Sequence, residues 1–434
     1  MDLSVFGVEV TDLAYDTRAV TPGALFFCIP GRSVDGHDLA AEAVERGAVA
    51  LVVEHRIAQL DVPQLVVPSV RDAMGPAAAE FFGRPSDALE IAGVTGTNGK
   101  TTTAFLLHAI LEAAGRRPAL LTNIARIVGG VERPTGLNTP EAIDLQRLLR
   151  EMLDVGDRSC AMEATSIGGA QGRLAGTRFR VLVFTNLTQD HLDFHGTMDA
   201  YFAAKRALFD QADAAVVNVD DEWGRRLSAE LPGAIAFSGD DELGAELRLR
   251  GRFNHENAAG AIAAARVLGI DADAIRRGLE SVDGVPGRFE SVEVGQPFSV
   301  IVDYAHTPDS LENVLRTARE LGAGRLTVVF GAGGDRDRDK RPLMGRIAAT
   351  FADRAIVTTD NPRSEDPQAI AEQVAEGQLE IVVDRRAAIE RALADASDGD
   401  VVVIAGKGAD TEMEIAGTFV PFDDRQVARE VLTR

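Results

Sequence analysis

The chain has 434 residues, of which 45% are hydrophobic and 26% are charged, and its formal net charge at pH 7 is −22. This length exceeds a single hydrophobic core, and the composition is that of a globular protein with two to four domains. The negative charge argues against a nucleic-acid partner, because a phosphate backbone needs a basic face. No apolar run is long enough to cross a bilayer, so we expect no membrane insertion.

The N-terminus and the cysteines predict a cytoplasmic protein. The first residues, MDLSVFGVEVTD, contain acids and lack the basic start and apolar stretch of a secretory signal. Cys28 and Cys160 each stand alone in an apolar segment. We therefore expect two buried, reduced thiols, and neither a disulfide nor a metal site.

Residues 1–86 predict a small N-terminal α/β domain. Apolar strands are expected at 24–29 and 48–53, with a helix at 39–46 between them. The segment Asp16-Thr17-Arg18 precedes Pro22-Gly23. From these residues alone, the segment is interpreted as a turn with an ion pair.

Residues 87–288 predict a nucleotide-binding domain. An apolar strand at 91–94 leads into the glycine-rich turn 96–101, which reads GTNGKT, and a helical pattern follows up to Gly115. Strand, tight loop and helix form the context of a phosphate-binding loop, in which backbone N–H groups and the helix N-terminus bind phosphate oxygens. Lys100 can reach the terminal phosphates, and the Thr101 hydroxyl can bind Mg²⁺.

Further strands alternate with helices along the rest of the chain. Strands are expected at 159–162, 181–185 and 214–217 in the second domain, which predicts a doubly wound parallel sheet. The alternation restarts with strands at 300–302, 326–330, 355–357 and 401–404, so residues 289–434 predict a third α/β domain. The segment 285–287, Val-Pro-Gly, is the expected hinge.

Polar residues follow the predicted strands of the second domain. Glu163, Asn186 and the Asp190-His191 loop fall at the C-terminal ends of strands, where the ligands of such sheets bind. Glu163 offers the oxygen ligands that Mg²⁺ prefers.

These motifs resemble those of the Mur ligases, the ATP-dependent amino-acid-adding enzymes of peptidoglycan synthesis. The resemblance extends over nearly the whole chain. It rests on eleven ordered segments, among them GVTGTNGKTTT (93–103), NTPEA (138–142), MEATS (162–166), FTNLTQDHLDFHG (184–196), YFAAKRALF (201–209), DYAHTPDSLENVL (303–315), DNPRSEDP (360–367) and AGKG (405–408). The fold that it implies is a three-domain α/β architecture with a central P-loop domain and a C-terminal Rossmann-like domain.

The resemblance implies roles for many residues. ATP-binding roles fall on Gly96, Thr97, Asn98, Gly99, Lys100, Thr101, Thr102, Asn254, Asn257, Arg288 and Asp303. Catalysis is expected to use Lys100, Glu163, His191 and a carbamylated Lys205, with two Mg²⁺ ions held by Thr101, Glu163, His191 and the Lys205 carbamate. Residues expected at the UDP-sugar substrate are Thr17, Asn138, Thr139, Thr165, Ser166 and Arg173. For Asp16-Thr17-Arg18, this replaces the interpretation as a simple turn.

Within the family, the chain is most similar to the third-step ligases, which add a diamino acid to UDP-N-acetylmuramoyl-L-alanyl-D-glutamate. The acceptor is expected to bind at Arg336, Asp360, Asn361, Pro362, Arg363, Gly406 and Asp410. Arg363 matches the members that add meso-2,6-diaminopimelate, whose distal carboxylate suits the bidentate guanidinium. The resemblance implies an acyl-phosphate intermediate, and we expect a monomer.

The chain departs from the family in two places that bear on its function. Gly406-Lys407-Gly408 is followed by Ala409-Asp410, where relatives usually have His-Glu, so the acceptor carboxylate is one methylene shorter. Ser166 is followed by Ile167 where relatives often have histidine. A Mur-type ligase for a different amino acid and a non-catalytic nucleotide-binding paralogue therefore remain alternatives. Retention of Lys100 and Lys205 argues against the second.

Overall fold

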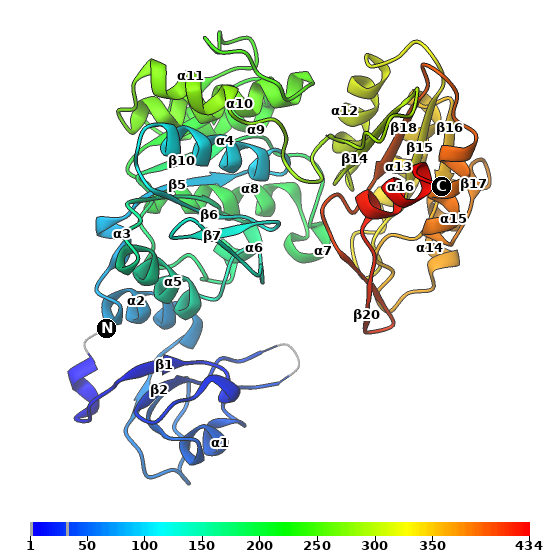
Figure 1. Ribbon diagram of the computed structural model, residues 1–434. Coiled ribbons are helices and arrows are strands. Elements are labelled where there is room, and N and C mark those ends of the chain that lie inside the picture. The colour runs from blue at the N-terminus through cyan, green and yellow to red at the C-terminus, as the bar shows by residue number, and fades with distance from the viewer. Residues whose placement is uncertain (1–2, 32–33) are drawn as a thin grey trace. The chain divides into compact units, whose positions relative to one another are not determined.

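The structure is a computed structural model that describes residues 3–31 and 34–434. Its strands form three main sheets and one separate hairpin, which confirms the predicted α/β class (Figure 1). The packing of Cα atoms divides the chain into two compact units, Met1–Thr95 with Gly115–Leu182 and Ala204–Ala215, and Gly96–Ala114 with Val183–Ala203 and Val216–Arg434. The domain boundaries at 86/87 and 288/289 stay a prediction. Residues 1–2 and 32–33 of the predicted first domain lie outside the described residues.

The first sheet is parallel and has the strand order β1-β2-β3-β4. Alternate side chains of β2 enter different cores: Leu25 and Phe27 pack with helix α2, whereas Phe26 packs with helix α1. The elements are β1 (Asp12–Ala14), β2 (Ala24–Phe27), α1 (Ala40–Glu45), β3 (Ala48–Val53), β4 (Gln64–Val66), α2 (Val70–Phe81) and α3 (Pro85–Ala88), with 3₁₀ turns at Leu3–Phe6 and Thr17–Ala19. The predicted strands and helix at 24–53 are thereby confirmed.

The second sheet has the strand order β12-β11-β10-β5-β9-β6-β7-β8. Strands β5, β9 and β6 pair in parallel, and the antiparallel strands β7 and β8, which the sequence pattern did not reveal, extend one edge. Its strands are β5 (Glu90–Thr95), β6 (Pro118–Leu121), β7 (Arg126–Val128), β8 (Val131–Arg133), β9 (Ser159–Glu163), β10 (Val181–Phe184), β11 (Ala215–Asn218) and β12 (Ile235–Phe237). The helices between residues 100 and 280 are α4 (Lys100–Ala113), α5 (Ala142–Asp154), α6 (Ser166–Ala170), α7 (Leu192–His195), α8 (Met198–Arg206), α9 (Glu222–Glu230), α10 (Arg252–Val267) and α11 (Ala272–Glu280), with a 3₁₀ turn at Ala207–Gln211.

The third sheet has the strand order β13-β14-β18-β15-β16-β17 and is parallel except for β13. Helices α12, α13 and α14 pack on one face, and α15 and α16 pack on the other (Figure 1). The elements are β13 (Glu290–Ser291), β14 (Ser299–Asp303), α12 (Pro308–Arg319), β15 (Leu326–Phe330), α13 (Lys340–Phe351), β16 (Arg354–Val357), α14 (Pro367–Ala375), β17 (Glu380–Ile381), α15 (Arg385–Ala394), β18 (Val401–Ala405) and α16 (Asp424–Leu432). Strands β19 (Glu412–Ile415) and β20 (Thr418–Pro421) form the separate hairpin.

The prediction of two buried, free thiols is confirmed within the described residues. Cys28 and Cys160 are free, buried thiols, and burial raises the pKa of each, to about 12 for Cys28. A search of the described helices finds none with the length and hydropathy needed to span a bilayer.

Candidate functional site

The glycine-rich loop joins the end of β5 to the start of α4, as the sequence predicted. Gly96 has φ of 143°, and a Cβ there would lie 1.9 Å from Oγ1 of Thr185. Gly99 has φ of 87°, and a Cβ there would lie 2.1 Å from Oδ1 of Asn257. Both positions therefore require glycine, because a side chain would be strained and would clash.

The segment after β10 binds the glycine-rich loop through hydrogen bonds. The Asn98 N–H donates to Oδ1 of Asn186 at 2.9 Å, and the Thr185 hydroxyl donates to the Asn98 carbonyl at 2.6 Å. The Thr188 N–H donates to the Thr97 hydroxyl at 3.0 Å, and that hydroxyl also lies 3.2 Å from the Tyr201 hydroxyl. These bonds fix the backbone whose N–H groups would bind phosphate.

Two side chains at the start of α4 are engaged within the protein. The Lys100 ammonium donates to the carbonyls of Thr97 at 2.6 Å and Gly96 at 3.1 Å. Nη2 of Arg288 donates to the Thr101 hydroxyl at 2.9 Å. Thr101 and Arg288, both predicted to bind ATP, are therefore in direct contact. To reach a phosphate, the Lys100 side chain must turn away from the two carbonyls to which it donates.

The two asparagines assigned to ATP lie on α10 and are buried. Nδ2 of Asn257 donates to Oδ1 of Asn254 at 3.2 Å, and Oδ1 of Asn257 accepts from the Thr103 hydroxyl at 3.4 Å. Asn257 therefore packs against the glycine-rich loop. Thr102 is buried in the first turn of α4.

Asp303 ends β14 and is buried. Its two oxygens accept the N–H groups of Phe289 at 2.6 Å and of Ala305 at 2.7 Å. Burial raises the pKa of this carboxyl, while the charge of Arg288 opposes the rise. Asp303, which was predicted to bind ATP, therefore orders the segment that follows the hinge through these two hydrogen bonds.

Glu163 is the last residue of β9 and is 2% exposed. It pairs in register with Val94, two residues before Gly96, and its Oε1 accepts the Asn123 N–H at 3.3 Å. A carboxylate therefore lies at the carboxyl end of the strand beside β5, as expected.

The Asp190-His191 loop forms a charged cluster at the start of α7. His191 has φ of 54°, and its Nε2 lies 3.4 Å from Oδ2 of Asp190. The same carboxylate lies 3.8 Å from Nε2 of His306 and 3.9 Å from the Lys340 ammonium. Burial alone would raise the pKa of Asp190, but His306, His191 and Lys340 hold it well below its usual range.

Lys205 lies on α8 and is 1% exposed, so the structure buries the lysine that the resemblance marks as modified. The neutral amine is the form that reacts with CO₂.

Several residues assigned to the UDP-sugar substrate meet at the starts of α5 and α6. The hydroxyls of Thr139 and Thr165 lie 2.8 Å apart, and Nη1 of Arg173 donates to the Thr139 carbonyl at 3.1 Å. Nε of Arg173 pairs with Glu141 at 3.0 Å, and Arg71 pairs with the same carboxylate at 3.3 Å. The sequence analysis did not predict the ion pairs of Glu141 with Arg71 and Arg173, because no local sequence pattern indicates them.

The other members of this predicted set lie as follows. Ser166 is the buried first residue of α6, and Asn138 is exposed before α5. Thr17 is buried in a 3₁₀ turn in which Arg18 pairs with Asp16. The turn and ion pair expected from these residues alone are therefore present.

The predicted acceptor residues gather at the carboxyl ends of β15, β16 and β18. Arg363 has φ of 51°, and its Nη1 donates to the Gly334 carbonyl at 2.7 Å. A Cβ on Gly406 would lie 2.3 Å from Oδ2 of Asp360, so the two loops touch. The loops after these three strands also contain Arg336, Asn361, Pro362 and Asp410.

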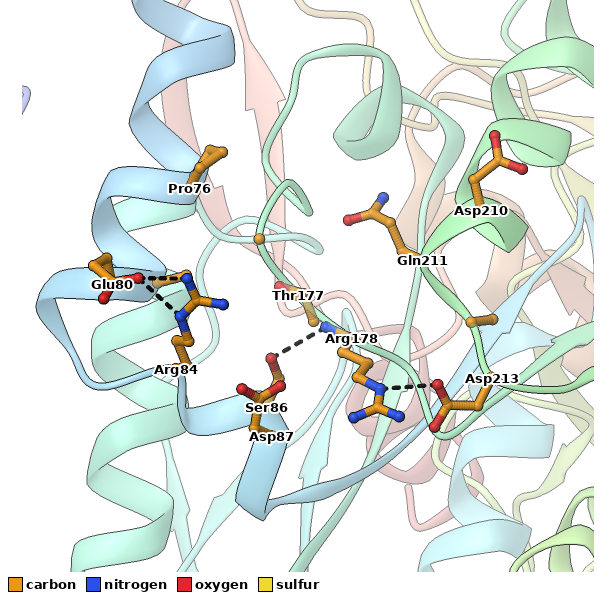
Figure 2. A pocket seen from close by; sticks show the side chains of 13 residues that line it. Pro76, Glu80, Arg84, Ser86, Asp87, Thr177, Arg178, Asp210, Gln211 and Asp213 are labelled. Carbon is orange, nitrogen blue, oxygen red and sulfur yellow. Dashed lines mark hydrogen bonds and ion pairs between the residues drawn. The ribbon is translucent and has the colours of Figure 1, made fainter. Parts of the chain in front are cut away.

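A cavity of about 460 Å³ is lined by residues other than the predicted site residues (Figure 2). Ser86 and Arg178, which line it, precede β5 and β10, whereas the glycine-rich loop follows β5. Its arginines are already paired, Arg84 with Glu80 at 2.7 Å and Arg178 with Asp213 at 2.8 Å. No predicted site residue lines this cavity.

Comparison with known proteins agrees with this arrangement. Three family models match in order: "Mur ligase family, catalytic domain" at 9–82, "Mur ligase middle domain" at 94–239, and "Mur ligase, glutamate ligase domain" at 287–408. The UDP-N-acetylmuramoyl-L-alanyl-D-glutamate--2,6-diaminopimelate ligase of Syntrophomonas wolfei is 44% identical over 466 residues, covering 98% of this chain and 95% of that protein. The ligase of the same name from Aquifex aeolicus is 43% identical over 463 residues, covering 100% of this chain and 95% of that one.

Solved structures are similar as well. One with the same ligase name is 32% identical, with a TM-score of 0.67, and covers 98% of this chain and 95% of its own. The MurF ligase of Thermotoga maritima in complex with ADP is 19% identical, with a TM-score of 0.66, and covers 99% of this chain and 98% of its own. At that identity, the likeness shows the fold alone.

Proposed function

This chain belongs to the Mur ligase family, and we propose that it joins meso-2,6-diaminopimelate to UDP-N-acetylmuramoyl-L-alanyl-D-glutamate in peptidoglycan synthesis. The observation that carries the acceptor assignment is Arg363, a partly exposed guanidinium on the loop after β16 whose Nη1 donates to the Gly334 carbonyl at 2.7 Å on the loop after β15. A guanidinium binds a distal carboxylate, which meso-diaminopimelate has and lysine lacks.

The reaction has two stages. The γ-phosphoryl group of ATP moves to the side-chain carboxylate of the D-glutamyl residue, which gives an acyl phosphate and ADP. The acceptor amine then attacks the acyl carbon, loses a proton and releases phosphate. Because a phosphoryl group moves between anions, Lys100 and the N–H groups of the glycine-rich loop neutralise and orient the phosphates.

Two Mg²⁺ ions fit the donors that the chain offers. The Thr101 hydroxyl, the Glu163 carboxylate and a Lys205 carbamate supply oxygen atoms, and His191 adds a nitrogen. Within residues 3–31 and 34–434, no three His, Cys, Asp or Glu side chains form a metal-binding group. When bound, the metal would neutralise charge on the transferring phosphoryl group.

The Lys205 carbamate is proposed from the burial of this side chain. The ammonium loses one proton to give the neutral amine, and the amine then adds CO₂ and releases a second proton, so a cation becomes the carbamate anion. A buried carbamate on α8 can bind Mg²⁺, whereas an ammonium would repel it.

The UDP-sugar substrate is proposed to bind along the first unit. Thr17 would contact the uridine diphosphate, and Asn138, Thr139, Thr165, Ser166 and Arg173 would hold the muramoyl-dipeptide. Arg173 already pairs with Glu141, so its guanidinium is oriented before substrate binds. We expect the protein to act in the cytoplasm as a monomer.

Phosphate release with an acceptor panel tests the proposal. The enzyme, ATP, Mg²⁺ and UDP-N-acetylmuramoyl-L-alanyl-D-glutamate are mixed with meso-diaminopimelate, L-lysine, L-ornithine or no acceptor. Release that requires meso-diaminopimelate supports the proposal. Preference for another amino acid would indicate a ligase of different specificity, and no release with any acceptor would indicate a non-catalytic paralogue.

A further inference from the structure

Lysine is rare in this chain. Of the 45 lysine and arginine residues, only four are lysines, namely Lys100, Lys205, Lys340 and Lys407. Exposed ion pairs in the described residues use arginine instead, as in the pairs of Arg226 with Asp199 and of Arg316 with Glu312. A guanidinium is a planar fork, whereas an ammonium is a compact point charge. A lysine in such a chain therefore indicates a position that needs the ammonium itself.

Three of the four lysines have a partner or a role already described. Lys100 donates to two carbonyls of the glycine-rich loop, and Lys205 is proposed to carry a carbamate. Lys407 is fully buried, and its ammonium donates to the Glu412 carbonyl. Lys340 is the lysine that remains.

Lys340 is a buried ammonium that makes no hydrogen bond within residues 3–31 and 34–434. It is the first residue of α13 and is 4% exposed. Its ion pair is with Oδ1 of Asp190 at 3.9 Å, which is too long for a hydrogen bond. Three N–H donors without an acceptor are costly in a buried group, so an anionic ligand would stabilise this side chain.

The segment 188–190 connects Lys340 to the glycine-rich loop. At one end of the segment, the Thr188 N–H donates to the Thr97 hydroxyl at 3.0 Å. At the other end, Asp190 faces the Lys340 ammonium. Strand β10, which this segment follows, lies next to β5, which the glycine-rich loop follows. The unsatisfied ammonium therefore belongs to the same edge of the sheet as the phosphate-binding loop.

The start of α13 is attached to the same segment. Nε2 of Gln189 donates to Oδ2 of Asp337 at 3.0 Å, and Oδ1 of Asp337 accepts the Asp339 N–H at 2.9 Å. Both oxygens of Asp337 are thus engaged, and the side chain of Asp339 does not cap the helix. The positive end of the α13 dipole adds to the charge of Lys340, and both favour an anion.

Asp190 does not depend on Lys340 alone. Its Oδ1 accepts the His191 N–H at 2.9 Å, and its Oδ2 lies 3.8 Å from Nε2 of His306. The Lys340 ammonium can therefore turn from Asp190 to another anion without leaving this carboxylate unpartnered.

On the premise of the proposed function, we propose that Lys340 binds the γ-phosphoryl group of ATP before and during its transfer. The D-glutamyl carboxylate oxygen forms a bond to the γ-phosphorus, the bond from that phosphorus to the β,γ-bridging oxygen breaks, and ADP leaves. Lys340 stays protonated throughout, because its part is to neutralise the negative charge on the transferring group. Lys100 and Lys340 thus bind the phosphates from α4 and from α13.

Nucleotide binding to the full-length protein tests this contact, with Mg²⁺ and without UDP-substrate or acceptor. Isothermal titration compares ADP with β,γ-methylene-ATP, which has a γ-phosphoryl group that is not transferred. In Lys340→Met, the Kd for β,γ-methylene-ATP should rise roughly tenfold or more, because a charge-assisted contact is lost. The Kd for ADP should stay within twofold. The matched control is Arg346→Met on the same helix, where the side chain pairs with Glu376 at the surface, and it should bind both nucleotides like the wild type.

The wild type offers a second measurement, which does not depend on the folding of Lys340→Met. Protein labelled with ¹³C at lysine Cε gives one NMR signal for each of the four lysines, and the signal of Lys340 is assigned by its absence in Lys340→Arg. The Lys340 signal should shift with β,γ-methylene-ATP and stay in place with ADP. The Lys100 signal should respond to both nucleotides and thereby report binding.

An equal rise in the Kd for both nucleotides in Lys340→Met would indicate a purely structural role and reject the inference. An unchanged Kd for β,γ-methylene-ATP, or a wild-type Lys340 signal that is the same with both nucleotides, would also reject it. In each of these cases the wild type still binds nucleotide, so the proposed function stands. A wild type that binds neither nucleotide overturns the proposed ATP-dependent function together with the inference.

Discussion

Arg385 and Asp424 form an ion pair in which neither side chain is exposed to solvent. Nη2 and Nε of Arg385 lie 2.6 and 2.7 Å from the two carboxylate oxygens. The same guanidinium donates to the carbonyls of Thr359 at 3.0 Å and Ala405 at 2.9 Å. Thr359 precedes Asp360, and Ala405 precedes Gly406. One buried arginine therefore orders both of these loops, which are proposed to bind the acceptor.

We predict that replacing one member of this pair will destabilise the protein. Arg385→Met leaves the Asp424 carboxylate buried without its partner, which costs roughly 3–5 kcal/mol. Urea unfolding of wild type and variant measures the loss. Arg386→Met, which removes a half-exposed ion pair with Glu430, should cost about 1 kcal/mol or less. Equal stability of Arg385→Met and Arg386→Met would contradict the prediction.

A second ion pair predicts a pH dependence. Arg341 is fully buried and donates to both oxygens of Glu365, whose pKa it lowers to about 2 from 4.5. Because the folded-state pKa is lowered, the stabilisation is full above pH 4.5 and is lost as the pH falls toward 2. The stability difference between wild type and Glu365→Gln should therefore shrink between these values in urea unfolding at several pH values. If the stability difference between wild type and Glu365→Gln stays constant down to pH 2, the predicted role of the Arg341–Glu365 ion pair is wrong.

Lys205→Ala should lose most activity, because this variant lacks the proposed carbamate that would help to bind Mg²⁺. Short carboxylates such as acetate or propionate should restore part of the activity by entering the vacated space. The neighbouring variant Arg206→Ala is the control, since that side chain pairs with Asp210 at 2.6 Å on the surface. Full activity of Lys205→Ala without added carboxylate would rule out the carbamate.

Arg363→Ala should weaken the use of meso-diaminopimelate selectively. A charge-assisted hydrogen bond contributes roughly 1.5–3 kcal/mol, or about one to two decades in affinity. The KM for meso-diaminopimelate should rise by that factor, while the KM values for ATP and the UDP-substrate change little. The surface variant Arg346→Ala is the control. An unchanged KM for meso-diaminopimelate in Arg363→Ala would refute the acceptor assignment.

The parts of the fold that could be predicted are those with local signals. The apolar run before Gly96 and the helical pattern after Lys100 lie within one segment, so strand, loop and helix were all found. The long buried strands were found for the same reason. Strands β7, β8, β12, β19 and β20 have three or four residues each, too few for an alternating pattern to stand out.

Site residues could be predicted from the sequence only where they belong to a recognised family motif. Arg385 looks like an ordinary helix charge, and its burial depends on Asp424, 39 residues later. Lys340 likewise gains its neighbour Asp190 only when α13 folds against the segment that follows β10. Such pairings are long-range, and no local pattern specifies them.

The most direct test is the mass of the product formed by the purified wild-type enzyme. The enzyme is incubated with ATP, Mg²⁺, UDP-N-acetylmuramoyl-L-alanyl-D-glutamate and equal amounts of meso-diaminopimelate and L-lysine. We predict a UDP-sugar product heavier by one diaminopimelate residue, with ADP and phosphate formed in equal amounts. A product that carries lysine, or ATP consumption without any heavier UDP-sugar, would contradict the proposed activity.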